Sequence, residues 1–362
     1  MIRLTIPETG AAEMEAIARV LRSGFLVQGA YVREFEEKVA AYLGVAHAVA
    51  VSSGTAALHL AVLALGLGPG DEVLVPDFTH PATANVVELA GARPVLVDVD
   101  LETLNVDAGR FRAALSPRTR ALMPVHLFGQ PVAMGPVLDL ARERGLKVIE
   151  DAACALGAED EGRRCGTVSD AGCFSFHARK VITTGEGGMV VTRDAATAER
   201  LRRLRNHGCV ETPEGRRFET AGFNYRLTEL QGAMGIAQMD RLERAIDRRA
   251  ELAGRYDQAL VRVAGVRQPR RRGNARPVWQ SYVVLLDEPI DRDRVRSRLG
   301  ADGIEATIGT YALSEQPQHS SAAGSLANSR LAFRQSLALP LHALMSEAEV
   351  DRVAQRLAAA IG

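Results

Sequence analysis

The chain has 362 residues, of which 47% are hydrophobic and 24% are charged, and its 44 Lys and Arg residues balance 44 Asp and Glu residues. This composition is typical of a soluble globular protein and leaves room for one large and one smaller domain. The zero net charge gives no reason to expect a nucleic-acid partner. We interpret the basic cluster Arg270–Arg272 as a solvated loop, with contact to an anionic substrate as the alternative.

Targeting and membrane segments are not expected. No apolar stretch approaches the ~20 residues that a membrane-spanning helix needs. The N-terminal sequence MIRLTIPETGAAEMEAIARVL lacks the continuous apolar core of a secretory signal. The cysteines form no CxxC pair and have no nearby histidines at zinc-ligand spacing, which predicts free thiols in a reducing cytosol, and no metal site. They are Cys154, Cys165, Cys173 and Cys209. We expect a cytoplasmic protein.

The first part of the chain alternates short apolar runs with helical patterns. Nearly continuous apolar strands are typical of a parallel sheet that is buried on both faces, and the βαβ rhythm favours one α/β domain. Helices are expected after SSGT and over Ala82–Ala90 and Val132–Arg144. The last two strands lie close together in sequence, which allows one of them to run antiparallel. The predicted strands are Ala46–Val51, Glu72–Pro76, Pro94–Val99, Arg120–Val125, Lys147–Glu150, Gly172–Phe176 and Gly188–Thr192.

From about Leu227 the pattern changes to long helices that run to Leu260 and link the first domain to a second one. The remainder predicts a smaller α+β domain with a strand at Val278–Leu285 and helices at Arg292–Leu299 and Glu347–Ala360. Arg, Gly, Ser, Gln and Pro are frequent in residues 267–276 and 312–328, which we expect to be loops. The predicted domains are residues 1–245, with an N-terminal helical segment, and residues 246–362.

Ligands of a parallel α/β sheet bind beyond the carboxyl ends of its strands, so the residues after each strand are the candidates. Ser52–Thr55 follow the first strand at a helix N-terminus, where a phosphate site and a plain N-cap are equally good interpretations. In PDFTHPAT, after the second strand, Phe78 is best explained by core packing, whereas His80 has a flat ring that can stack on a planar group. His126, after the fourth strand, is more typical of a structural hydrogen-bonding group than of a catalyst.

Asp151 and Lys180 are two further candidates, and together they indicate a catalytic site. Asp151 follows the fifth strand, where a carboxylate is costly to bury without a partner. It is either a helix N-cap or the partner of a protonated heterocyclic nitrogen, as in enzymes that use pyridoxal phosphate (PLP). Lys180 follows the strand that ends near Phe176 and precedes the glycine-rich turn at Gly185–Gly188. A surface lysine is commonplace there, but a desolvated lysine beside a cationic ring can lose its proton and act as a nucleophile.

An ordered set of motifs then extends over nearly the whole chain and resembles the DegT/DnrJ/EryC1/StrS family of PLP-dependent sugar aminotransferases. The motifs are SGFLVQGAYVREFEEKVAAYLG, SSGTAALHL, GPGDEVLVPDFT, GARPVLVDVD, PVHLFGQP, VIEDAACALGA, FSFHARKVITTGEGGMVVT, RNHG, FNYRLTELQGAMGIAQ and LALPLH. The resemblance implies the fold type I architecture: a large domain with a mostly parallel seven-stranded sheet between helices, and a smaller C-terminal α+β domain.

The resemblance also implies a role for each matching residue. Lys180 would bind PLP covalently and act as the general base, and Asp151 would pair with the pyridine nitrogen. Asn224 would reach the phosphate of the other subunit, which implies a homodimer with shared active sites. His126 and the turn at His207–Gly208 would lie nearby without an assigned role. The phosphate would be held within the subunit by Gly54, Thr55 and Ser175.

Two positions depart from the family pattern. His80 stands where an aromatic residue often stacks on the cofactor, and we expect it to take that role. Cys154 stands where a glutamine often bonds the ring hydroxyl of the cofactor, and a thiol is a much poorer partner. Cys154 is therefore either a cofactor-binding residue that bonds the cofactor differently from the usual glutamine, or a small buried residue.

The predicted reaction moves an amino group from an amino acid, by resemblance L-glutamate, to a nucleotide-linked keto-sugar. Alternatives are a cyclitol or other non-nucleotide ketone as acceptor, a dehydratase of the same fold, and a regulatory PLP-binding protein without turnover. Retention of Lys180 argues against the dehydratases that carry histidine in its place. Substrate selection is expected from residues 209–222 and 305–325.

Overall fold

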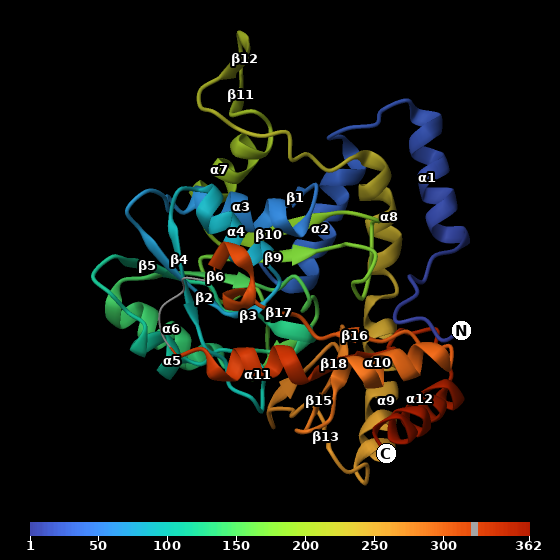
Figure 1. The fold of residues 1–362 in the computed structure, drawn as a ribbon. Helices are drawn as coiled ribbons and strands as arrows, with labels where there is room; N and C mark the ends of the chain where they lie inside the picture. The colour runs from blue at the N-terminus through green and yellow to red at the C-terminus, as the bar shows by residue number, and fades with distance from the viewer. Residues whose placement is uncertain (320–324) are drawn as a thin grey trace.

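The computed structural model describes residues 1–319 and 325–362. Its centre is a seven-stranded sheet in the order β1-β10-β9-β6-β5-β2-β4 (Figure 1). All neighbouring strands are parallel except that β10 runs antiparallel to both β1 and β9, which confirms the expected reversal. The strands are β1 (His47–Val51), β2 (Glu72–Pro76), β4 (Arg93–Val97), β5 (Thr119–Leu122), β6 (Lys147–Asp151), β9 (Ala171–Ser175) and β10 (Gly188–Thr192).

Helices cover both faces of this sheet, because successive side chains of a strand point to opposite faces. In β1, Val49 and Val51 pack in the core beneath the helices α3, α4 and α7. Ala48 and Ala50 point the other way, into the core formed with α2. The covering helices are α2 (Ala30–Leu43), α3 (Gly54–Ala64), α4 (Ala82–Leu89), α5 (Ala108–Ala113), α6 (Met134–Arg144), α7 (Ala195–Arg205) and α8 (Glu229–Met239), with α1 (Ala11–Ser23) packed on α8.

The C-terminal part forms a second, antiparallel sheet in the order β13-β15-β18-β16, below the first sheet in Figure 1. Its core contains the buried aromatic rings of Tyr256, Trp279 and Tyr282. The elements are α9 (Leu242–Leu260), β13 (Val266–Arg267), β15 (Tyr282–Leu286), α10 (Arg292–Ala301), β16 (Thr307–Ile308), α11 (Ala327–Gln335), β18 (Ser336–Leu339) and α12 (Glu347–Ile361).

The long helical segment that follows Leu227 is two helices, because α8 ends at Met239 and α9 begins at Leu242. The second helix connects the two cores. Leu242 and Ile246 near its start pack with the large sheet, whereas the residues from Leu252 to Leu260 pack in the small domain. We therefore propose that α9 belongs to both domains and that the predicted boundary after residue 245 lies near this crossover.

The strand expected at Val278–Leu285 begins only at Tyr282. The cause is local: Trp279 has a positive φ of 50°, and the carbonyl groups of Trp279 and Gln280 are taken by the side chain of Arg249. Backbone groups that bond to a side chain in this way do not join the strand ladder. Two shorter pairings also escaped the sequence patterns, namely the hairpin of β11 (Cys209–Thr212) and β12 (Gly215–Phe218), and the pair of β3 (Phe78–Thr79) with β17 (Tyr311–Ala312).

The segments expected to be loops are mostly short connections. Within residues 267–276, only the end of β13 and β14 (Ala275–Arg276) are strand, and β14 pairs with β7 (Glu159–Asp160), which in turn pairs with β8 (Arg163–Arg164). Residues 312–328 begin with 3-10 turns at Leu313–Glu315 and Pro317–His319, and residues 320–324 lie outside the described part. In the described ranges, no helix is both long enough and apolar enough to span a membrane.

Candidate active site

Lys180 lies just beyond the carboxyl end of β9, in a turn that its backbone N–H closes by donating to the carbonyl oxygen of His177 at 2.9 Å. Its side chain points back toward the neighbouring strand, where its Nζ donates a hydrogen bond to the Sγ of Cys154 at 3.0 Å. Cys154 follows β6, which pairs with β9 in parallel. The parallel register therefore brings together Lys180 and Cys154, which are 26 residues apart in sequence.

Asp151 is the last residue of β6 and only 5% of its surface is exposed. Its carboxylate accepts hydrogen bonds from the Oγ1 of Thr83 at 2.9 Å and from the backbone N–H of Ala153 at 3.2 Å. Thr83 is fully buried on α4. The carboxylate is thus held at the sheet edge by two neutral donors, with no cationic side chain bonded to it among the described residues, and a positively charged ligand group can pair with it.

The start of α3 and the end of β9 approach each other closely. Ser53 caps the helix, because its Oγ accepts from the N–H of Ala56 at 3.0 Å. A Cβ atom on Gly54 would lie 2.7 Å from the Cβ and 3.1 Å from the Oγ of Ser175, so only glycine fits there. Thr55 lies in the first helical turn and is exposed. Free N–H groups at a helix N-terminus beside a hydroxyl form a cradle suited to a phosphate group.

His80 lies at the mouth of this region, and its Nδ1 accepts a hydrogen bond from the N–H of Ala82 at 3.2 Å. His80 keeps part of its surface exposed. Partial burial, followed by the positive charge of Lys180, lowers the pKa of His80 below its ordinary value, while Asp151 opposes this shift. A neutral ring at neutral pH is therefore favoured.

His126 and Phe78 have structural partners, as the sequence suggested. The Nδ1 of His126 accepts from the N–H of Val132 at 3.0 Å, so the proton lies on Nε2, which is 2.9 Å from the Oε2 of Glu150. Glu150 is fully buried, which alone would raise its pKa, but hydrogen bonds from His126, from Gly166 and from a serine hydroxyl hold the pKa of this carboxyl below its ordinary value. Phe78 is buried edge-on against Phe128.

The His207–Gly208 turn and Asn224 lie together, away from the Lys180 turn in sequence. His207 has a positive φ of 58°, and a Cβ on Gly208 would lie 1.8 Å from the carbonyl oxygen of Thr220. Asn224 forms an isolated antiparallel bridge with Asn206, and its side chain is exposed. Among the residues described, no hydrogen bond joins the Asn224 side chain to Gly54 or Ser175 of the same chain.

One neighbour of Lys180 was not found from the sequence. The Nε2 of Gln280 donates to the carbonyl oxygen of Arg179 at 3.1 Å, and its Oε1 accepts from the hydroxyl of Ser281 at 3.1 Å. The backbone of Gln280 is fixed in turn by the buried guanidinium of Arg249, which donates to its carbonyl oxygen at 3.3 Å. Gln280 lies in a connection between the two domains, and a single glutamine in a loop forms no pattern that sequence reasoning can use.

The sequence profile of the DegT/DnrJ/EryC1/StrS aminotransferase family matches residues 7–358. GDP-perosamine synthase of Caulobacter vibrioides is 44% identical over 330 residues, covering 90% of this chain and 88% of that protein. The crystal structure of the aminotransferase TlmJ from Streptoalloteichus hindustanus is 36% identical with a TM-score of 0.95, and the match covers 99% of this chain and 98% of that one. The crystal structure of DesI in the presence of its TDP-sugar product is 35% identical with a TM-score of 0.91, over 99% of this chain and 92% of that one. The chain therefore belongs to the DegT/DnrJ/EryC1/StrS aminotransferase family and has its fold type I architecture, which confirms the fold class and the aminotransferase activity predicted from the motifs.

Proposed function

We propose that the protein is a cytoplasmic, homodimeric PLP-dependent aminotransferase that transfers an amino group from an amino acid to a keto-sugar. The observation that carries this proposal is the placement of an amine and a buried carboxylate, Lys180 and Asp151, at and beyond the carboxyl ends of two adjacent parallel strands. The glycine cradle formed by Gly54 and Ser175 lies at the same edge of the sheet. The residues present therefore fit a ligand that carries an aldehyde, a ring nitrogen and a phosphate.

When bound, PLP supplies an electron sink that stabilises negative charge on the reacting carbon. The Asp151 carboxylate would pair with the ring nitrogen and keep it protonated, and Thr83 and Ala153 would hold the carboxylate in place. The N–H groups of Gly54 and Thr55 and the hydroxyl of Ser175 would bind the phosphate, together with Asn224 of the partner subunit. The exposed position of the Asn224 side chain is compatible with a role across a subunit boundary.

The remaining groups would govern the transferable proton and the cofactor ring. Lys180 would bind the cofactor through Nζ and, once displaced from it, would act as the general base that takes the proton from the amine-bearing carbon of the substrate. Cys154 lies within hydrogen-bond distance of the same Nζ. His80 would stack on the cofactor ring in its neutral form, which its lowered pKa favours.

The proposed amino donor is L-glutamate, and the proposed acceptor is a nucleotide-linked keto-sugar. The support for the acceptor comes from the relatives, one of which is named a GDP-perosamine synthase and another of which was crystallised with its TDP-sugar product. The exposed hairpin β11–β12, which projects from the large domain in Figure 1, and residues 305–319 are the proposed determinants of acceptor choice.

The test is the visible absorbance of the purified protein with PLP, recorded before and after addition of L-glutamate. We expect a coloured band that glutamate bleaches and that is missing in Lys180→Ala. A band that glutamate leaves unchanged would point to another donor or another reaction. A wild-type protein without a band, or a band that persists in Lys180→Ala, would refute the assignment of the lysine.

A further inference from the structure

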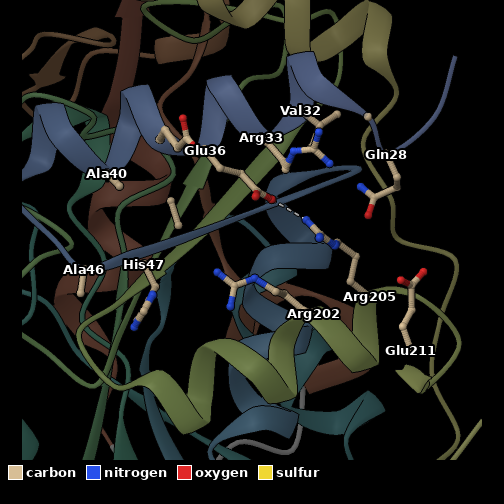
Figure 2. A pocket seen from close by; sticks show the side chains of 13 residues that line it. Gln28, Val32, Arg33, Glu36, Ala40, Ala46, His47, Arg202, Arg205 and Glu211 are labelled. Carbon is tan, nitrogen blue, oxygen red and sulfur yellow. Dashed lines mark hydrogen bonds and ion pairs between the residues drawn. The ribbon is translucent and has the colours of Figure 1, made fainter. Parts of the chain in front are cut away.

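A cavity of about 550 Å³ lies at the outer edge of the large sheet, between α2 on one side and α7 on the other (Figure 2). The floor includes the start of β1, the edge strand, and Glu211 of β11 lies at one end. Lys180 does not line this cavity and follows β9, which is separated from β1 by β10. The cavity is thus distinct from the lysine turn, and its volume is within the range of small-molecule sites.

Part of the wall is an ion pair between Arg205 and Glu36, which also bonds the free backbone groups of the edge strand β1. The Nη1 of Arg205 donates to the Oε1 of Glu36 at 2.6 Å and to the carbonyl oxygen of Ala50 at 2.7 Å. The same Glu36 oxygen accepts from the N–H of Ala50 at 2.8 Å. The free backbone groups of Ala50 on β1 are therefore satisfied by this pair, and Arg205 balances the charge of Glu36.

The wall also carries hydrogen-bond donors without acceptors. Only 7% of Arg205 is exposed, yet its Nε is buried without a partner, and the buried Nε2 of Gln28 also has none. A buried donor without an acceptor costs about 1–3 kcal/mol, so such groups call for a ligand or an ordered water. Both residues line the cavity, where a ligand rich in acceptors could complete their hydrogen bonding.

Positive charge faces the same space. Figure 2 shows the side chains of Arg33 and Arg202 at the cavity on opposite walls, α2 and α7. Within residues 1–319 and 325–362, neither guanidinium lies within ion-pair distance of a carboxylate, and Glu211 is 3.3 Å from Arg216. Glu37 is the other acid in the lining. Three arginines and three glutamates line the cavity, but Arg205 is paired with Glu36 and Glu211 with Arg216, which leaves two unpaired arginines and Glu37.

We propose that this cavity binds the phosphate group of a small metabolite, held by Arg33 and Arg202 and by the unpartnered donors of Arg205 and Gln28. Phosphate oxygens accept several hydrogen bonds at once and match the planar guanidinium group of arginine. Inorganic phosphate and a nucleoside diphosphate carry the same recognised chemistry. The site is separate from the amino-transfer site, so a ligand here would act as a second, independently bound species.

The experiment is isothermal titration calorimetry on the PLP-loaded full chain, with potassium phosphate and GDP as separate probes at constant ionic strength. We expect wild type to bind at least one probe. The double variant Arg33→Ala/Arg202→Ala should bind about tenfold or more weakly, because charged hydrogen bonds are lost. Binding of both probes identifies an oxyanion site, and binding of GDP alone identifies a nucleotide site.

The matched control is Arg142→Ala, which removes an exposed arginine on α6 that pairs with Asp139 and does not line the cavity. It should bind like wild type. If the alanine double variant does not fold, Arg33→Lys/Arg202→Lys keeps the charge and should still bind more weakly, because lysine lacks the planar fork. The proposal is overturned if wild type binds neither probe at millimolar concentrations, or if the double variants bind as wild type does.

Discussion

The Nζ of Lys180 and the Sγ of Cys154 lie 3.0 Å apart, so the thiol occupies the position directly beside the reactive amine. Sulfur is a weak hydrogen-bond acceptor and a thiol is a weak donor. The contact therefore orients Lys180 less firmly than an amide or hydroxyl would. This pairing makes Cys154 a sensitive position for cofactor affinity.

We predict that Cys154→Gln binds PLP about fivefold more tightly than wild type. The side-chain amide can donate a hydrogen bond to the ring hydroxyl of the cofactor, and such a bond is worth about 1 kcal/mol. Cys154→Ala should weaken binding by less than about fivefold, since it removes only a weak partner. Both dissociation constants can be measured by titrating the protein with PLP and following the visible band. A Cys154→Ala protein without any band would show that the thiol is essential, contrary to this prediction.

Gln280 should position the turn that carries Lys180, because its side-chain amide bonds the carbonyl oxygen of Arg179 at 3.1 Å. We expect Gln280→Leu to lower kcat by about five- to thirtyfold, equivalent to about 1–2 kcal/mol, with little change in KM. Steady-state kinetics with saturating donor give both values. Ser281→Ala is the matched control, since it removes only the bond to the Oε1 of Gln280 and should have a smaller effect. A rise in KM with kcat unchanged would contradict a positioning role.

Asp151→Asn keeps the size of the side chain but removes its charge. The amide oxygen can still accept from the N–H of Ala153, and the amide nitrogen can donate to the hydroxyl of Thr83, so the fold should be preserved. The ring nitrogen would lose its anionic partner, and we expect activity to fall by about a hundredfold or more, as is usual when a preorganised electrostatic group is removed. Activity assays together with circular dichroism check this expectation. An active Asp151→Asn variant would exclude the proposed pairing with the ring nitrogen.

His342 should make the protein less stable in mild acid. Burial, followed by the positive charge of Arg249, lowers the pKa of His342 from 6.5 to about 4. Between these values the unfolded chain binds a proton that the folded chain does not, so the free energy of unfolding falls as the pH falls. The loss amounts to about 2 kcal/mol at about pH 5.

This contribution can be isolated with His342→Gln, which does not titrate. Urea unfolding at about pH 7.5 and about pH 5 should show a smaller acid-induced loss of stability in the variant than in wild type, by about 2 kcal/mol. The same loss in both proteins would assign the acid sensitivity to other groups.

The fold class was accessible from the sequence because buried parallel strands must be apolar on both faces. The runs that became β1, β2, β6 and β10 were found close to their observed bounds. The reversal at β10 followed from its short connection to β9, since parallel neighbours need a long crossover. The strand at Tyr282 was placed too early, because apolar composition at Val278 and Trp279 says nothing about which side chain takes the backbone carbonyls.

The candidate site divides in the same way. Asp151 and Lys180 were candidates from the sequence because both follow strands of a parallel sheet, whose carboxyl ends share one edge, and the cofactor roles that the resemblance adds to them stay predictions. Only the tertiary structure decided the contacts between them. Lys180 and Cys154 are 26 positions apart in sequence, and Gln280 and Arg179 are 101 apart. The ion pair that joins α7 to α2 spans 169 positions. Such pairs depend on the direction in which each side chain leaves its backbone once the elements are packed. The hydrophobic periodicity of the sequence does not determine that direction.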